Sequence, residues 1–170
     1  MSICTINVNG IAKLPKREKV FKYLLNKHFD IYLLQETHLP DVTQGKLSET
    51  QWGGRALWSP GTNRSAGVGL LLHPGSSIEI LSHNIDTDGR VHVLVAKLKQ
   101  NDRTFQLINV YAPNKHSERE TFFRTLWRLL FCNVDKIMTS DFNCIPDVHV
   151  DKWGGDDNFG DKGIPQLHAF

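Results

Sequence analysis

The chain has 170 residues, of which 40% are hydrophobic and 22% are charged, an ordinary composition for one globular domain with a real hydrophobic core. Twenty basic residues against eighteen acidic ones give a formal charge of +2, so net charge alone does not indicate a nucleic-acid-binding protein. No apolar run approaches the roughly 18 residues of a membrane span, and the N-terminus lacks the pattern of a secretory signal. The three cysteines, Cys4, Cys132 and Cys144, are an odd number without metal-type spacing. We therefore expect a protein of a reducing, intracellular compartment, nuclear or cytoplasmic, that is not secreted.

The first third of the chain predicts a strand, a helix and a second strand. Residues 3–8 alternate apolar and polar side chains, as a strand does. Residues 13–28 show apolar side chains at helical spacing, with Pro15 in the first turn and a lysine-rich opposite face. Residues 31–35 are a short apolar run, typical of a strand buried on both faces. Residues 39–54 are polar and contain a proline, so we expect a loop there.

The middle of the chain predicts an antiparallel meander. Short strand-like runs separated by turn-forming residues occur at residues 55–58, 68–72, 77–81, 91–98 and 105–111. Consecutive strands joined by short turns pair in antiparallel fashion.

The last predicted elements are a helix and a strand. Residues 117–131 have an apolar stripe at helical spacing, formed by Phe123, Leu126, Trp127 and Leu130. Ser117 and Glu120 have the spacing of a capping box at its start. Residues 136–140 predict the final clear strand, and residues 167–170 resemble the opening of another helix. The order of elements predicts an α/β layered architecture with mixed sheets.

Three of the predicted strands end in polar side chains that do not belong in a core. In chain order these are Asn7, Asn9, Glu36, His38, Asp141 and Asn143. In layered α/β folds, functional sites collect at one end of the sheets. A glutamate and an aspartate brought together there would bind a hard cation such as Mg²⁺, which prefers oxygen ligands and keeps water positions open for a phosphate. Asparagine amides can hold phosphate oxygens or orient a carboxylate.

Taken singly, each of these residues also has an ordinary structural interpretation. Asn7, and the pair Asp141 and Asn143, could form turns. Glu36 could be a solvent-facing loop residue, and Tyr111 could cover the edge of the core. The lysines of the first helix could form a solvated face. The combination of these residues in this order is what indicates a site.

Six motifs, in order and with sensible gaps, resemble the endonuclease/exonuclease/phosphatase superfamily. They are NVNGI (7–11), LLQETHL (33–39), AGVGLLL (66–72), GRVHVLVAKL (89–98), LINVYAPN (107–114) and SDFN (140–143). Within the superfamily the chain is most similar to the apurinic-type endonuclease domain of LINE-like, non-LTR retrotransposon polyproteins, for which QETHL and NVYAPN are characteristic. The resemblance runs from Ile3 to about Asp151. It implies a four-layer α/β sandwich of the DNase I type, with two central sheets flanked by helices.

The resemblance implies hydrolysis of a DNA phosphodiester with Mg²⁺ (or Mn²⁺), which nicks target DNA and leaves a 3′-hydroxyl to prime reverse transcription. It implies that Glu36 is the metal ligand and that Asn7 helps to hold the metal or the phosphate. It implies that Tyr111 hydrogen-bonds the scissile phosphate and that Asp141 orients or deprotonates the attacking water. Asn143 would hold the phosphate and its developing charge. Phosphoryl transfer needs this kind of positioning and charge neutralisation.

Other residues are supporting candidates. Arg90, in the GR motif, and His38 are expected to support the site. The basic residues that follow the first strand, Lys13, Lys16 and Arg17, are candidate contacts to the phosphates of DNA, the expected partner.

The chain departs from the family pattern in two places. Ser140 stands where the family usually has glycine, which is tolerated unless the position needs a positive φ. Nothing after Asn143 matches the closing Ser-Asp-His motif, since neither His149 nor His168 follows an aspartate. We therefore expect one domain over residues 1–170 that lacks the C-terminal strands and is incomplete by about 60 residues. Such a domain would self-associate or be completed by a missing C-terminal segment, and would nick weakly or not at all.

Two further hypotheses remain open. The chain could be a catalytically inactive, truncated or domesticated fragment that acts only by binding. It could instead be an abasic-site repair endonuclease or a phosphatase of the same superfamily, although the QETHL and YAPN wordings favour the retroelement branch.

Overall fold

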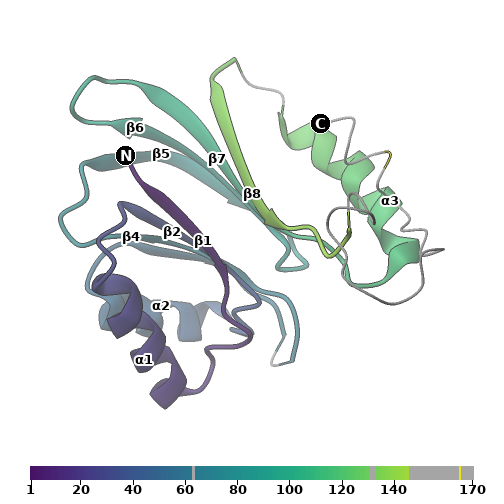
Figure 1. Cartoon of the computed structure of the whole chain (residues 1–170), viewed down its shortest axis with the longest axis horizontal. Coiled ribbons are helices and arrows are strands. Elements are labelled where there is room, and N and C mark those ends of the chain that lie inside the picture. Colours follow the sequence, from purple (N-terminus) through teal and green to yellow (C-terminus); the bar gives the residue numbers. More distant parts are fainter. Residues whose placement is uncertain (63, 131–132, 146–164, 166–170) are drawn as a thin grey trace. The chain divides into compact units, whose positions relative to one another are not determined.

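The computed structural model of the chain describes residues 1–62, 64–130, 133–145 and 165. Two compact units make it up: Met1–Tyr111 with Val134–Asp141, and Ala112–Asn133 with Phe142–Phe170 (Figure 1). The expectation of one domain over residues 1–170 stays a prediction. His149, His168 and the helix expected at residues 167–170 lie outside the described residues.

The first unit contains a four-stranded sheet with the strand order β1-β2-β4-β3. The strands are β1 (Ile3–Asn7), β2 (Ile31–Gln35), β3 (Ala56–Ser59) and β4 (Val68–Leu72). β1 and β2 are parallel, and the other two pairs are antiparallel. The side chains of β2 are all buried, as predicted for a strand covered on both faces. Parallel pairing brings the carboxyl ends of β1 and β2 to the same edge, which places Asn7 opposite Gln35.

A second four-stranded sheet of the same unit has the order β5-β6-β7-β8. Its strands are β5 (Ile78–Ile85), β6 (Val91–Leu98), β7 (Thr104–Tyr111) and β8 (Asp135–Asp141). The first two pairs are antiparallel, which confirms the predicted meander for its last three strands, and β7 and β8 are parallel. The meander strands predicted at residues 55–58 and 68–72 pair in the first sheet instead. Both sheets are therefore mixed, and every predicted strand is present.

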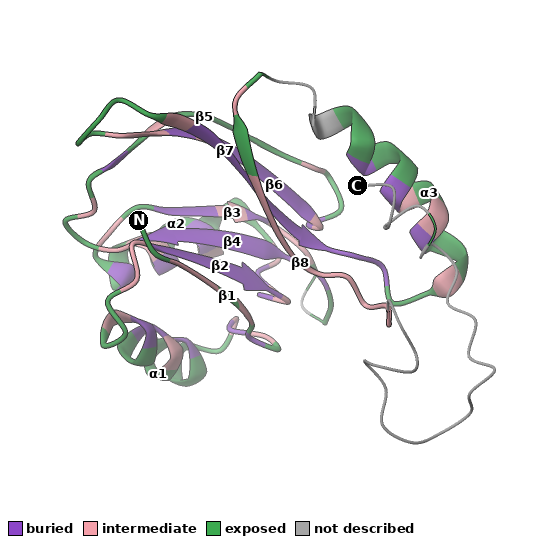
Figure 2. Cartoon of the chain, turned by 45° about the horizontal axis from the view of Figure 1, so that its top comes forward, coloured by how far each residue is buried: buried purple, intermediate pink, exposed green. Residues whose placement is uncertain are grey.

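The two sheets face each other across an apolar core (Figure 2). From the first sheet Leu33 and Leu70 enter this core, and from the second Leu94 and Leu107 do. On the outer side of the first sheet lie α1 (Leu14–Leu25) and α2 (Val42–Trp52), visible in Figure 1. Phe21, Tyr32 and Trp52 pack there edge to face, with ring centroids 5.4 and 5.5 Å apart. The expected α/β sandwich with two central sheets is confirmed.

The helix α2 shows that the loop predicted at residues 39–54 is wrong. Asp41 caps the helix by accepting a hydrogen bond of 2.9 Å from the backbone N–H of Gln44. Gly53 ends the helix in the left-handed conformation, with φ of 77°. The helix buries Gly45, Ser48 and Trp52. This narrow, mostly polar stripe explains why apolar spacing did not reveal the helix.

The second unit contains α3 (His116–Leu126), followed by the 3₁₀ helix η1 (Trp127–Leu130). The expected capping box at its start is wrong, because Lys115 is the N-cap residue and its side chain makes no cap hydrogen bond. Glu120 instead accepts a hydrogen bond of 2.6 Å from Arg124, one turn further along the helix.

The inner stripe predicted for this helix is confirmed in part. Phe123 and Leu126 are buried, whereas Trp127, the first residue of η1, is 37% exposed. The burial predicted for Leu130 lies outside the described side chains. Among the described residues, no helix has the length and apolar character needed to cross a membrane.

Candidate active site

Four predicted site residues come together in the first unit, at the ends of β1, β2, β7 and β8. These residues, Asn7, Glu36, Tyr111 and Asp141, are called the acid–amide cluster below. The side-chain amide of Asn7 donates to Glu36 Oε1 at 3.0 Å and to Asp141 Oδ2 at 2.8 Å. The hydroxyl of Tyr111 donates to the same Glu36 Oε1 at 2.7 Å. One amide thus joins the two carboxylates; the motifs led us to expect these residues in one site, but not this pair of bonds.

The parallel strand pairs explain how these residues meet. Asn7 lies opposite Gln35, the residue before Glu36, and Tyr111 lies opposite Asp141. Since the two sheets stack face to face, one pair from each sheet reaches the same edge. This edge carries the polar ends of four strands whose remaining inward side chains are mostly apolar.

Glu36 and His38 have strained backbone conformations. Their φ angles are 52° and 55°, in the left-handed region that non-glycine residues rarely adopt. Backbone hydrogen bonds hold this turn: Gly10 N–H donates to the Glu36 carbonyl at 2.6 Å, and His38 N–H donates to Ala66 at 3.0 Å. Such conformations cost about 1–3 kcal/mol each and cluster at functional sites.

The surroundings of Glu36 favour its ionised form. Burial alone would raise its pKa, but the hydrogen bonds from Asn7 and Tyr111, with the charge and hydrogen bond of His38, outweigh burial and lower the pKa of Glu36. Both hydrogen-bond donors use Oε1, whereas His38 Nε2 lies 3.6 Å from Oε2. The cluster therefore holds a fixed carboxylate that is charged at neutral pH.

Arg90 supports Tyr111, the role that the sequence assigned to it in general terms. Its Nη1 donates to the Tyr111 carbonyl at 3.3 Å, and its guanidinium lies 5.3 Å from the centre of the Tyr111 ring. The Asp86 carboxylate, which sequence reasoning missed, accepts the backbone N–H groups of Arg90 and Val91 at 2.9 and 3.0 Å. This aspartate fixes the turn that presents Arg90.

Two buried amides, also missed from the sequence, connect the two sheets. Gln35 Nε2 donates to Asn109 Oδ1 at 2.6 Å and to Thr5 Oγ1 at 2.9 Å. Asn109 Nδ2 in turn donates to the backbone carbonyls of Leu34 at 3.0 Å and Gly69 at 2.9 Å. Asn109 is fully buried, and Gln35 is nearly so.

Gln35 and Asn109, called the amide bridge below, lie next to the acid–amide cluster along their strands. Gln35 directly precedes Glu36, and Asn109 lies two residues before Tyr111 on the same face of β7. The bridge therefore fixes the separation of Glu36 and Tyr111 across the two sheets. An amide within an otherwise apolar strand is the sequence signal that could have revealed it.

Asn143 belongs to the second unit. There its side-chain amide donates to the Ala112 carbonyl at 2.8 Å and to Asn114 Oδ1 at 3.2 Å. Its φ of 49° is also in the left-handed region. Its expected role toward a phosphate stays a prediction. Ser140 lies within β8 and needs no positive φ, so serine is accommodated there.

Lys13 and Lys16 are exposed and border an open pocket of about 410 Å³. Asn9, Gly10, Ala12 and His38 complete its lining. The Lys16 ammonium donates to the Asn9 carbonyl. Because His38 also faces Glu36, the pocket places two lysines beside the acid–amide cluster.

Arg17 is not a DNA contact, which corrects the prediction from sequence. Its side chain is only 3% exposed. Its Nη1 donates to the carbonyls of Ile11 and Ala12 at 3.1 and 3.0 Å, and its Nε donates to Gln51 at 2.7 Å. Burial lowers its pKa. Arg17 instead fixes the start of α1 to the loop that follows β1.

The oxygen-rich cluster fits a hard divalent cation. Among the described residues no group of three or more His, Cys, Asp and Glu side chains could hold a metal ion. Mg²⁺ nevertheless commonly binds through one or two carboxylates while keeping several waters. Glu36 and Asp141, joined through one amide, match this requirement.

No family model matches the chain. Over 126 residues, 74% of its length, the chain is 32% identical to the "Transposon TX1 uncharacterized 149 kDa protein" of Xenopus laevis, and the match spans 9% of that protein.

Solved structures share the fold at low sequence identity. The mannosyl-6-phosphatase Bt3783 of Bacteroides thetaiotaomicron VPI-5482 has a TM-score of 0.64 at 14% identity, over 84% of this chain and 65% of that one. An AP endonuclease from Archaeoglobus fulgidus has a TM-score of 0.65 at 22% identity, over 86% of this chain and 59% of that one. An endonuclease/exonuclease/phosphatase family protein from Bacteroides thetaiotaomicron has a TM-score of 0.65 at 13% identity, over 84% and 63%. The chain therefore spans less than two thirds of each. The resemblance inferred from the six motifs is confirmed: the chain has the α/β fold of the endonuclease/exonuclease/phosphatase proteins, and a transposon protein is among its relatives.

Proposed function

We propose that the chain is the DNA-nicking endonuclease domain of a non-LTR retrotransposon, which hydrolyses one phosphodiester of target DNA with Mg²⁺ or Mn²⁺. The observation that carries this proposal is the Asn7 amide that joins the carboxylates of Glu36 and Asp141. The similarity to a transposon protein supports a retroelement nuclease over a repair enzyme.

The metal would be held by Glu36, while Asp141 would act on the attacking water. When bound, the ion would supply Lewis-acid stabilisation of the negative charge that develops on the phosphate. The hydrogen bonds of Asn7 and Tyr111 keep Glu36 ionised and in one orientation, so little reorganisation is needed when the substrate arrives.

Asp141 is the general base of the proposed reaction. Its carboxylate takes a proton from the attacking water, a bond forms from the water oxygen to phosphorus, and the bond from phosphorus to the 3′-oxygen breaks. The leaving oxygen is protonated from solvent, which gives a 3′-hydroxyl and a 5′-phosphate. Asn7 donates to Asp141 Oδ2 and thereby orients the carboxylate toward the water.

The lysine-lined pocket beside the cluster would hold the DNA strand. Lys13 and Lys16 are exposed there, and His38 links the pocket to Glu36. Phosphate contacts of this kind set the position of the duplex without reading its sequence.

A plasmid-nicking assay tests the proposal. Supercoiled plasmid is incubated with the chain in Mg²⁺, in Mn²⁺ and in EDTA, beside Glu36→Ala and Asp141→Ala. We expect weak nicking, because no Ser-Asp-His motif follows Asn143, with open-circle DNA only in the presence of metal and its loss in both variants. Nicking that persists in EDTA or in both variants would refute the assignment, as would a wild-type chain that binds DNA but never nicks it.

The fold similarity to an AP endonuclease makes abasic DNA the necessary comparison substrate. We expect comparable nicking of intact and abasic duplexes. Cleavage confined to the abasic site would replace the retroelement assignment with a repair function.

A further inference from the structure

One exposed side of α1 carries lysines and a tyrosine in a single line. Lys16, Lys19, Tyr23 and Lys27 are spaced by three, four and four residues, so they share one face of the helix. All four side chains are exposed, and Tyr23 is 55% exposed. Lys27 follows the helix end, yet its ammonium lies 5.0 Å from the centre of the Tyr23 ring, on the same side. These four residues are called the basic stripe.

Among the described residues, the charges of the basic stripe have no acidic partner. In the part of the chain that the structure describes, none of its lysines forms an ion pair, whereas Lys97 pairs with both Glu79 and Asp102. Lys16 is bonded only to a backbone carbonyl, that of Asn9. A chain with a formal charge of +2 thus concentrates unpaired positive charge on one helix face. Charge concentrated in this way attracts polyanions.

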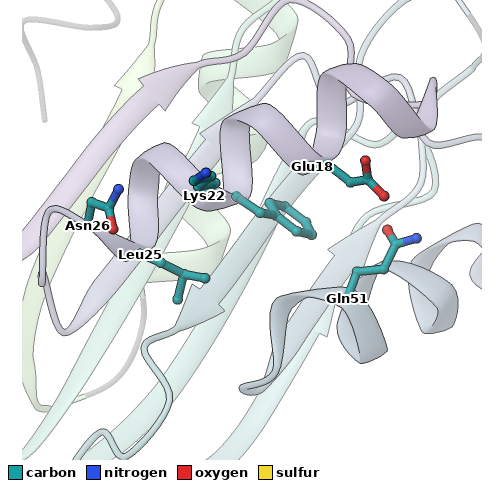
Figure 3. Close-up of a pocket in the computed structure, with 6 residues that line it drawn as sticks. Glu18, Lys22, Leu25, Asn26 and Gln51 are labelled. Carbon is teal, nitrogen blue, oxygen red and sulfur yellow. The ribbon is translucent and has the colours of Figure 1, made fainter.

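The opposite exposed side of α1 has a different character. Glu18, Lys22, Leu25 and Asn26 there line a shallow pocket of about 250 Å³ with Phe21 and with Gln51 of α2 (Figure 3). This pocket mixes charges and apolar groups. The positive face of the helix is therefore the basic stripe and not the whole exposed surface.

The basic stripe begins beside the acid–amide cluster and leads away from it. Lys16 borders the pocket that also contains His38, and His38 faces Glu36. From Lys16 to Leu25, the last residue of α1, the helical rise is about 14 Å. At 3.4 Å per step of one strand, this length corresponds to about four nucleotides of a DNA strand.

We propose that the basic stripe is a second contact to the phosphate backbone of duplex DNA, flanking the cut. The inference rests on the proposed function, which places the scissile phosphate at the acid–amide cluster. Lys19 and Lys27 neutralise phosphates beyond the lysine-lined pocket, and the Tyr23 hydroxyl can donate to a phosphate between them. An anionic membrane is a poorer partner, because insertion needs an exposed apolar helix face. Here the apolar face, with Phe21 and Leu24, is buried in the first unit.

Salt-dependent DNA binding tests this surface. Fluorescence anisotropy of a labelled duplex in EDTA measures Kd over a range of salt concentrations for the wild-type chain and for Lys19→Gln/Lys27→Gln. The matched control is Lys46→Gln/Lys99→Gln, which removes two exposed lysines outside the stripe. Each phosphate contact contributes about 0.9 to the slope of log Kd against log salt. The slope should therefore decrease by about 1.8 in the stripe variant and stay unchanged in the control variant.

An unchanged slope in the stripe variant, or an equal loss in both variants, overturns the proposal. Binding of the wild-type chain to vesicles of anionic lipid but not to duplex DNA also overturns it. Nicking by the same preparations is measured in parallel with Mg²⁺. If the chain nicks DNA but the stripe variant binds DNA as the wild-type chain does, only the proposed role of the basic stripe is refuted. If the stripe variant binds DNA more weakly but the wild-type chain does not nick, the nuclease proposal is refuted and the role of the stripe in binding stands.

Discussion

The acid–amide cluster and the basic stripe differ in how their charges are held. In the cluster, Asn7 and Tyr111 hydrogen-bond the carboxylates directly, and Glu36 stands on a strained backbone turn. In the stripe, Lys16 and Lys19 project from a regular helix and Lys27 from the turn after it, and none has an acidic partner in the described part of the chain. Fixed, prearranged groups suit charge stabilisation in a reaction, whereas long exposed side chains suit adaptable, salt-dependent contact. The comparison predicts that the cluster controls rate and the stripe controls affinity.

The largest effect is expected where the cluster loses a charge. Glu36→Gln or Asp141→Asn keeps the shape of the side chain but removes its negative charge, so nicking should fall by about 10²–10³-fold or more. The stability of each variant, followed by circular dichroism during heating, should remain near that of the wild-type chain. If either variant nicked at the wild-type rate, the acid–amide cluster would not control the rate of the reaction.

A single hydrogen bond of the cluster is removed by Tyr111→Phe. The ring and its contact with Arg90 remain, but Glu36 loses its 2.7 Å donor. A hydrogen bond to a charged group is worth about 1.5–3 kcal/mol, so nicking should fall by about 10- to 100-fold. The pKa of Glu36, followed by NMR of its carboxyl carbon, should rise. Tyr23→Phe, in the basic stripe, is the control and should leave that pKa unchanged.

The amide bridge of Gln35 and Asn109 should stabilise the fold. Asn109→Leu leaves Gln35 and the carbonyls of Leu34 and Gly69 without their buried partner, at a cost of about 1–3 kcal/mol. Denaturant unfolding measures this loss directly. Asn84→Leu removes an exposed side chain whose amide oxygen accepts the backbone N–H of the neighbouring Ile85, so it should change stability by no more than about 0.5 kcal/mol. If both variants lost the same unfolding free energy, the amide bridge would not be stabilising the fold.

The stability of the fold should depend on pH through His92 in the interior and, at lower pH, through Glu36 in the cluster. His92 is fully buried beside Asn109, neither ring nitrogen has a hydrogen-bond partner in the described part of the chain, and burial with the charge of His83 lowers its pKa from 6.5 to about 3. The unfolded chain therefore binds a proton that the folded chain rejects, and stability falls as pH drops from 6.5 toward 3, by at most about 1.4 kcal/mol per pH unit.

His92→Leu should flatten the unfolding free energy over this range, as measured by denaturant titrations at several pH values. Glu36 acts at lower pH, because its lowered pKa stabilises the fold above the ordinary value of 4.5 and that stability is lost as pH falls below it. An unchanged slope between pH 4.5 and 6.5 in His92→Leu would contradict the assignment.

The sequence was sufficient where a local pattern decides the structure. Alternation, short apolar runs and turn-forming residues between them revealed every strand, and the polar strand ends indicated Asn7, Glu36 and Asp141 as site candidates. Arg17 was misjudged because charge was weighed above position, although its spacing from Phe21 and Leu24 places it on the buried face of α1. The helix α2 was missed because its buried stripe is short and mostly polar, and its signals are caps rather than periodicity.

Long-range contacts could not be read from the sequence. The Asn7 amide meets Asp141 only because β1 and β8 belong to two stacked sheets. The bond from Gln35 to Asn109 likewise crosses between sheets, and no local pattern specifies its partner. The motifs predicted that Asn7, Glu36, Tyr111 and Asp141 share one site, and the structure shows the hydrogen bonds that join them.

Single-turnover nicking at increasing enzyme concentration tests the central distinction most directly. We predict that Glu36→Gln lowers the maximal rate while the concentration for half-maximal rate stays near that of the wild-type chain. Lys19→Gln/Lys27→Gln should act mainly by raising that concentration, more strongly at higher salt. A Glu36→Gln chain that reaches the wild-type maximal rate at saturation would contradict the account.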